Sequence, residues 1–241
     1  MKKLTPAQRH QQRIRAAEAA AAPETSHSMA GATTYEMQLM QLKQDQLRLR
    51  QMQSIDARNK LKPELLPVYD AYIDGVLAAG QGQQDEVLTT IMVWHFDVAS
   101  WARGLQIAGY VLGHKMKMPD RFERTGATLV AEEVANAALT VLKADGDFDP
   151  EVLDCTHALT TEHDMPDEVR AKLLLARALA SKPTEDSPMP QLQQAKDQLI
   201  EAIRLHERVG AKKDLERIER WLKKHADQPA PKEKQADGEQ G

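Results

Sequence analysis

Hydrophobic positions along most of this chain recur every three or four residues, which is the spacing of one face of an α-helix. The segment 63–79 shows the pattern with Leu65, Tyr69, Ile73 and Val76, and it stops at Gly80. No stretch alternates apolar and polar residues rich in Val, Ile or Thr, as a half-buried strand would. Aromatic residues are only 4% of the chain, whereas helix formers are abundant. The pattern predicts an all-α fold.

Capping residues divide the pattern into helices. Thr5 before Pro6 pairs a cap with a first-turn proline, so a basic helix is expected from residue 7 to residue 22. Thr33 and Glu36 have the spacing of a capping box and predict a long helix that ends near Lys60. Further helices are expected over 63–79, 85–95, 97–113, 128–144, 150–163, 166–181, 192–209 and 212–225.

These helices fall into five parts. They are a basic N-terminal arm with a linker (1–32), a long helix that is a candidate for oligomerisation (33–62), a central helical domain (63–163), a C-terminal helical hairpin (164–225) and a tail (226–241). The hairpin resembles a tetratricopeptide unit, although one unit does not make an array. The tail consists largely of Pro, Lys, Glu, Gln and Gly, which predicts disorder.

The long helix carries two adjoining seams of core-like spacing. One consists of Tyr35, Leu39, Leu42, Gln46, Leu49 and Gln53, and the other of Met37, Met40, Gln44, Leu47 and Gln51. Glutamines at alternate core positions are typical of a helix that packs on partner helices. Two seams are also wider than one partner needs, which favours a ring of copies. We therefore expect self-association through Leu39, Leu42, Leu47 and Leu49, and the alternative is a surface helix lying on its own domain.

Charge is sorted along the chain, beneath a net charge of −4. Residues 1–62 carry eleven Lys and Arg against five Asp and Glu, residues 63–180 carry nine against nineteen, and residues 181–241 carry twelve against twelve. A basic segment binds polyanions because neutralising phosphates releases counterions. The alternative is a solvated charged helix without a partner. The expected DNA contacts are Lys2, Lys3, Arg9, Arg13, Arg15, Arg58, Lys60, Lys62, Lys115 and Lys117.

Carboxylate clusters are weak candidates for metal sites. The acidic run that starts at Asp145 resembles a calcium loop, but its sixth position is Pro150, where that loop needs glycine. An acidic turn with Asp149 as a helix cap is the simpler interpretation. The only neighbouring set for a two-metal nuclease is Asp85, Glu86, His95, Asp97 and His114. Since Asp85 and Asp97 also lie where helix caps are expected, we predict no catalytic residue and no metal site.

Other classes of protein are disfavoured by what the sequence contains. There is no Gly-rich phosphate loop, so no nucleotide cofactor is expected. The single cysteine, Cys155, cannot form an intrachain disulfide and fits a reducing cytoplasm. No run approaches eighteen apolar residues, so no membrane partner is expected.

Several stretches together resemble the gpM family, the terminase small subunit (often labelled the terminase endonuclease subunit) of Peduovirus-type tailed phages. The resemblance extends over about residues 5–224. It rests on Thr5-Pro-Ala-Gln-Arg-His10, Thr34-Tyr-Glu36, Glu64-Leu-Leu-Pro67, Gly75-Val-Leu77, Gly80-Gln-Gly-Gln-Gln-Asp85, Met92-Val-Trp94, Met118-Pro119, Glu132-Glu-Val-Ala135, Asp164-Met-Pro-Asp-Glu-Val-Arg-Ala-Lys-Leu173, Gly210-Ala-Lys-Lys213 and Glu216-Arg-Ile-Glu-Arg220.

The resemblance implies a role in packaging a phage genome. The small subunit of such a terminase binds double-stranded DNA at the packaging site, recruits the large ATPase and nuclease subunit, and forms a homo-oligomeric ring. Similar proteins end in a long basic tail, whereas this chain has only Lys232 and Lys234 there. Two alternatives stay open: a metal-dependent endonuclease subunit that cuts concatemeric DNA, and a helical adaptor that does not contact DNA.

Overall fold

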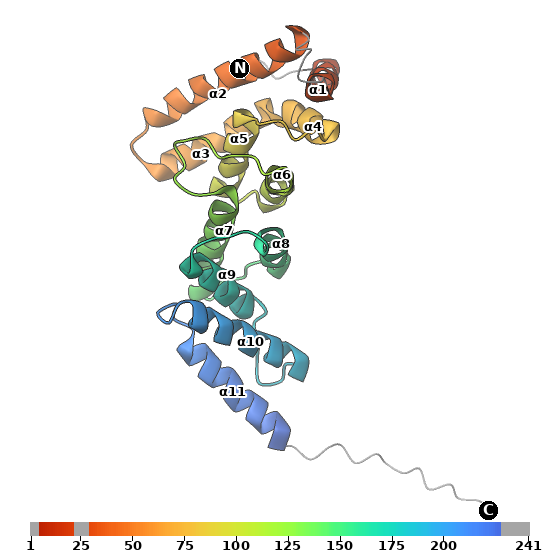
Figure 1. Ribbon diagram of the computed structural model, residues 1–241. Coiled ribbons are helices and arrows are strands. Elements are labelled where there is room, and N and C mark those ends of the chain that lie inside the picture. Colours follow the sequence, from red (N-terminus) through yellow and green to blue (C-terminus); the bar gives the residue numbers. More distant parts are fainter. Residues whose placement is uncertain (1–4, 22–28, 228–241) are drawn as a thin grey trace, which may run out of the picture.

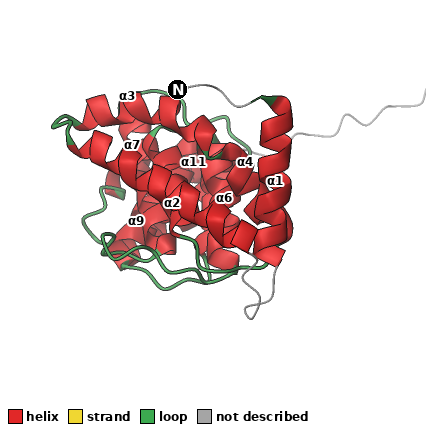
Figure 2. Ribbon diagram, turned by 90° about the horizontal axis from the view of Figure 1, so that it is seen from above, coloured by secondary structure: helices red, strands yellow, loops and turns green. Residues whose placement is uncertain are grey.

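The computed structural model of the chain describes residues 5–21 and 29–227. Lys2, Lys3 and the predicted tail from residue 228 lie outside these ranges. Within them the fold is all-α, as predicted, and no strand occurs (Figure 2). The α-helices are α1 (Pro6–Ala21), α2 (Met29–Arg50), α3 (Ile55–Leu65), α4 (Asp70–Ala79), α5 (Glu86–Asp97), α6 (Trp101–Gly113), α7 (Gly126–Lys143), α8 (Pro150–Thr160), α9 (Asp167–Ala180), α10 (Met189–Leu205) and α11 (Lys212–Asp227), with a 3₁₀ helix, η1 (Leu66–Val68).

The helices form a stack in which each contacts mainly its neighbours (Figure 1). At the N-terminal end, α1 packs on α2 and α4, and α2 reaches α5. In the middle, α7 contacts α8 and α9. At the C-terminal end, α10 lies between α9 and α11. The acidic central part is therefore the middle of the stack, and the basic first helices form one end of it. Whether the C-terminal helices make a tetratricopeptide-like unit stays a prediction.

The hydrophobic core is continuous through the stack and is densest around α5. Every residue of this helix from Val87 to Phe96 is buried. Its Trp94 ring lies edge-on to Tyr69, with the ring centroids 6.1 Å apart. A helix that is apolar on all sides is stable only when other elements surround it. Here α2, α6 and α7 pack against it.

The predicted long helix is two helices. α2 begins at Met29, so Thr33 lies inside it and does not cap it, and it ends at Arg50. The hydroxyl oxygen of Ser54 then accepts a hydrogen bond from the Ala57 amide at 3.3 Å, which caps α3. Pro63 lies within the last turn of α3 and does not open a helix. The break lets α3 turn back beneath α2 (Figure 1).

Several predicted caps are confirmed, and a second one, besides Thr33, is wrong. At the start of α1, the Gln8 backbone amide donates to the Thr5 hydroxyl oxygen at 3.3 Å, and the Thr5 backbone amide donates to the Gln8 side-chain oxygen at 2.8 Å. Asp85 accepts from the Leu88 amide at 2.9 Å, and Asp149 accepts from the Glu151 amide at 2.9 Å. Asp97, in contrast, is the last residue of α5 and not the cap of α6.

The basic helix α1 is docked on the body through a close contact at Gly75 of α4. A Cβ atom at Gly75 would lie 2.5 Å from the Cβ of Ala16 and 2.7 Å from the Arg13 carbonyl oxygen. Ala16 itself is buried. The small residues at this crossing therefore allow the two helices to approach closely.

We expect Gly75→Ala to displace α1 from α4, because the added methyl group meets backbone atoms that cannot rotate away. The cost should be about 1–3 kcal/mol. Tryptic cleavage within α1 should accelerate relative to the wild type. Gly113→Ala is the matched control, because no atom lies within 4 Å of its added Cβ. Equal cleavage rates for both variants would contradict the docked position of α1.

Candidate nucleic-acid interface

Most cations in the middle of the stack are paired with carboxylates. Arg103 contacts Asp74 at 2.7 Å, and Arg177 contacts Asp154 at 2.8 Å. These contacts join different helices and leave little positive charge for a ligand. The acidic middle is therefore a poor surface for DNA.

The first two helices present cations of a different kind. Arg13 and Arg15 on α1, and Lys43 and Arg50 on α2, are exposed, and no described carboxylate lies within 4.0 Å of them. Arg9 is also exposed on α1. Unpaired surface cations near one another favour binding of a polyanion, because their charge is not neutralised within the chain.

Three other predicted DNA contacts lie on α3, and they differ in exposure and in their partners. Lys60 is exposed and pairs with Asp56 at 2.7 Å, an exposed contact that is easily exchanged. The Arg58 guanidinium donates to the Met52 carbonyl oxygen at 2.8 Å. Both remain at the same end of the stack as α1 and α2 (Figure 1).

Lys62 does not fit the predicted DNA-binding role. It is only 8% exposed, and its ammonium donates to Asn59 at 2.8 Å and to Asp97 at 2.6 Å. Its charge therefore fixes the end of α5 to α3 and does not face solvent. A DNA contact at Lys62 is therefore disfavoured, because its charge is already paired; the sequence shows the charge of Lys62 but not its partner.

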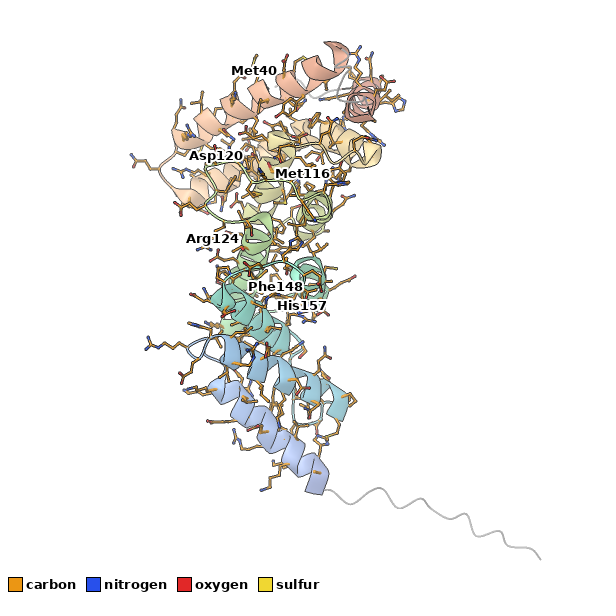
Figure 3. All side chains as sticks on the ribbon, in the orientation of Figure 1. Met40, Met116, Asp120, Arg124, Phe148 and His157 are labelled. Atoms are coloured by element: carbon orange, nitrogen blue, oxygen red, sulfur yellow. The ribbon has the colours of Figure 1, made fainter. Side chains whose placement is uncertain are left out.

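Lys115 and Lys117 lie on a loop that is held rigidly against the body. The Gln84 side chain donates to the Lys117 carbonyl at 2.8 Å and accepts from the Lys117 amide at 2.8 Å. Further along, Arg121 contacts Glu86 at 2.9 Å. Met116 is buried between the two exposed lysines, and Figure 3 labels it together with Asp120 and Arg124 of the same loop. The loop therefore presents two cations without a described carboxylate partner.

A second set of unpaired cations was not predicted. Charge is balanced over residues 181–241, so no net charge points to a binding surface there. Among the described side chains of this region, five carboxylates are engaged in ion pairs, for example Glu207 with Lys212 and Asp214 with Arg217. The exposed cations left without a described carboxylate partner are Arg208, Lys213, Arg220 and Lys223.

Two buried carboxylates join neighbouring elements: Asp45 joins α2 to the residue after η1, and Asp85 joins the start of α5 to α4. Asp45 of α2 accepts from the Tyr69 hydroxyl at 2.9 Å and from the Gln41 amide at 2.9 Å. Asp85 accepts from the Tyr72 hydroxyl at 2.5 Å. Burial raises the pKa of Asp85, and burial together with the neighbouring Asp85 charge raises the pKa of Tyr72. Asp85 thus has structural partners for both its oxygens.

The candidate nuclease residues are not brought together. Asp85 and Asp97 lie at opposite ends of α5, about 18 Å apart at 1.5 Å per residue. His95 lies in the core, and the His114 ring lies against Tyr110 at a tilt of 54°, with the ring centroids 4.4 Å apart. In the described ranges, no three His, Cys, Asp or Glu residues lie close enough to hold a metal ion.

The leucines predicted to join copies of the chain divide into two groups. Leu42 and Leu49 are 0% and 7% exposed and belong to the core of their own subunit, and Leu39 packs against the same core. Leu42 and Leu49 therefore offer little surface to a partner, whereas Leu39 is only partly buried. Leu47 is 57% exposed, and Met37 and Met40 of the same seam are 55% and 62% exposed.

No helix in the described part of the chain is both long enough and apolar enough to cross a membrane. The exposed surface of the stack is instead polar over most of its length.

Residues 39–168 match the family model described as phage small terminase subunit. This chain belongs to that family. It is also 38% identical, over 228 residues, to a protein of Escherichia phage P2 named "Terminase, endonuclease subunit". The match covers 95% of this chain and 89% of that protein. No solved structure matches significantly.

Proposed function

We propose that this protein is the DNA-recognition subunit of a phage terminase. It binds double-stranded DNA at the packaging site and recruits the large ATPase and nuclease subunit. The observation that carries this proposal is the group of exposed cations without a described carboxylate partner on α1 and α2, at the end of the stack that adjoins the acidic middle. Family membership supports a role in genome packaging.

The division of labour follows from the charges. The end of the stack that holds α1, α2 and α3 meets DNA phosphates, with Lys115 and Lys117 as additional contacts. The acidic middle does not lie on DNA, since like charges repel. The C-terminal helices α10 and α11 are the candidate surface for the large subunit. A titration with duplex DNA at low salt tests the proposal, and an absence of any binding would favour the helical adaptor.

The name of the phage P2 relative raises the question of whether the chain cuts DNA by itself. We expect the purified chain not to nick supercoiled plasmid with magnesium or manganese, because its carboxylates do not converge. Asp85→Ala should cost about 1–2 kcal/mol of stability through the lost cap and the unpaired Tyr72 hydroxyl. It should leave cleavage by the complete terminase within a few-fold of normal.

A plasmid-nicking assay on the isolated protein decides this question. Asp149→Ala is the matched control, because it also removes a helix cap but lies far along the chain from the nuclease candidates. Nicking that Asp85→Ala abolished and Asp149→Ala preserved, with both variants folded, would assign a catalytic role to Asp85.

Copies of the chain are proposed to associate, as the family resemblance implies. A ring remains a prediction. A ring built on α2 alone would need both of its seams, and the inner seam packs within the subunit. A ring would therefore need a further contact surface besides α2.

A further inference from the structure

The outer face of α2 carries hydrophobic side chains that no described part of the chain covers. Met37, Met40 and Leu47 are exposed, and with Gln44 and Gln51 they repeat at spacings of three and four residues. In Figure 1, α2 forms the N-terminal edge of the stack, with no described helix beyond it. Such spacing is typical of the contact between two packed helices.

We propose that a second copy of the chain covers this face, with the two α2 helices packed antiparallel. The contact is isologous, so the same face of both copies takes part. Since the inner seam of α2 packs on its own subunit, the outer seam has room for one partner helix and not two. The proposal deepens the assembly proposed above by naming its surface and direction.

The charges beside the seam select the antiparallel direction. Glu36, Lys43 and Arg50 lie seven residues apart along one edge, all exposed and without a described ion-pair partner. In an antiparallel pair, this edge lies beside the same edge of the partner helix, which runs in the opposite direction. Glu36 then meets Arg50 of the partner subunit twice, and Lys43 meets Lys43 of the partner subunit once.

A parallel pair lacks these attractions. There, each such edge faces the opposite edge of the partner helix, which places Lys43 beside Arg48 of the partner subunit in two symmetric contacts. No contact between opposite charges compensates. The charges on this edge of α2 therefore complement a second copy of the same edge only when the two helices are antiparallel. This self-complementarity favours a second copy of the chain over an unrelated partner.

This pairing would also set the distance between the two DNA-binding helices. α1 lies near the end of α2 that holds Met29 (Figures 1 and 2). An antiparallel pair therefore places the two copies of α1 toward opposite ends of α2, whose 22 residues span about 33 Å. One turn of DNA is about 34–36 Å, the spacing at which paired binding elements reach successive grooves on one side of the duplex. This step rests on the proposed DNA binding by α1.

The test is a set of charge reversals, with mass measured by light scattering in the absence of DNA. Glu36→Arg and Arg50→Glu should each weaken association about tenfold or more, because each creates two like-charge contacts. The double variant Glu36→Arg/Arg50→Glu should regain the wild-type mass, as should an equimolar mixture of the two single variants. Rescue within one chain is ruled out, because the two residues lie about 21 Å apart along one helix.

The matched control is Lys223→Glu, which reverses an exposed charge on α11 and should leave the mass unchanged. A wild-type monomer, single variants of unchanged mass, or a double variant that stays dissociated would each overturn the antiparallel pair. Single variants of unchanged mass that no longer bind the large subunit would assign this face to that subunit. Because mass is measured without DNA, failure of the pair is distinguishable from failure of DNA binding.

Discussion

Neutralising the five cations of the N-terminal segment should reduce the slope of log affinity for duplex DNA against log salt by roughly 4–5. The change replaces Lys2, Lys3, Arg9, Arg13 and Arg15 with glutamine. Each lost phosphate contact removes about 0.9 from the slope, because fewer counterions are released on binding. Substitution is preferable to deletion, since α1 covers part of α4 and its removal would uncover buried side chains.

The control for this experiment comes from the opposite end of the stack. Replacing the exposed cations Arg208, Lys213, Arg220 and Lys223 with glutamine removes almost as much charge. This variant should bind DNA with a slope close to that of the wild type. If the slope fell in the C-terminal variant and not in the N-terminal one, DNA would bind at α11 and the proposed orientation of the subunit would be reversed.

The second large effect concerns acid stability and His95. This side chain is buried in α5, and neither of its ring nitrogens has a hydrogen-bond partner among the described residues. Burial, with a smaller contribution from the Arg103 charge, lowers the pKa of His95 to about 4 from its usual 6.5. The unfolded chain therefore binds a proton at His95 between pH 6.5 and 4, where the folded chain does not.

The sign follows from this difference in proton binding. The stability that depends on a neutral His95 is fully present above pH 6.5 and is lost as the pH falls towards 4. A difference of about 2.5 pH units corresponds to about 3 kcal/mol at 1.36 kcal/mol per unit. We expect His95→Leu to lose much less stability over the same range, and to match or exceed the wild type at pH 7.

Urea unfolding of both proteins at pH 7 and pH 4.5 measures the effect. The quantity of interest is the difference between the two proteins, because other groups also titrate in this range. Ion pairing with Lys172 and Lys212 lowers the pKa of Glu168 and Glu207, respectively, and both proteins share these effects. An equal loss of stability in the two proteins would show that His95 is protonated without cost in the folded state.

The helices could be predicted because their signals are local. Asp85 and Asp149 precede hydrophobic repeats and cap them, and the two partners of each cap lie within three residues. The sequence does not predict the break between α2 and α3, although Ser54 provides a cap, because the three- and four-residue spacing of core-like positions continues to Gln53. When a capping residue lies within a continuing helical repeat, the helix can either end there or continue. The tertiary contacts of α3 decide that it ends.

The candidate interface could be predicted only in outline, because pairing depends on residues distant in sequence. Lys62 finds Asp97 across 35 positions, and no local feature announces that contact. Likewise, the two seams of α2 are visible in the sequence, but only the fold shows that Leu42 faces the subunit's own core and Leu47 faces outward. Charge and periodicity indicate which side chains are available to make contacts, and the fold determines which contacts they make.

The stacked arrangement has a consequence for how such a subunit can diversify. Since each layer contacts mainly the adjacent ones, a change at the α1 end disturbs few contacts at the α11 end. The part proposed to meet the genome and the part proposed to meet the motor can therefore vary independently. A chimaera joined between α9 and α10 should keep the DNA preference of one parent and the motor specificity of the other.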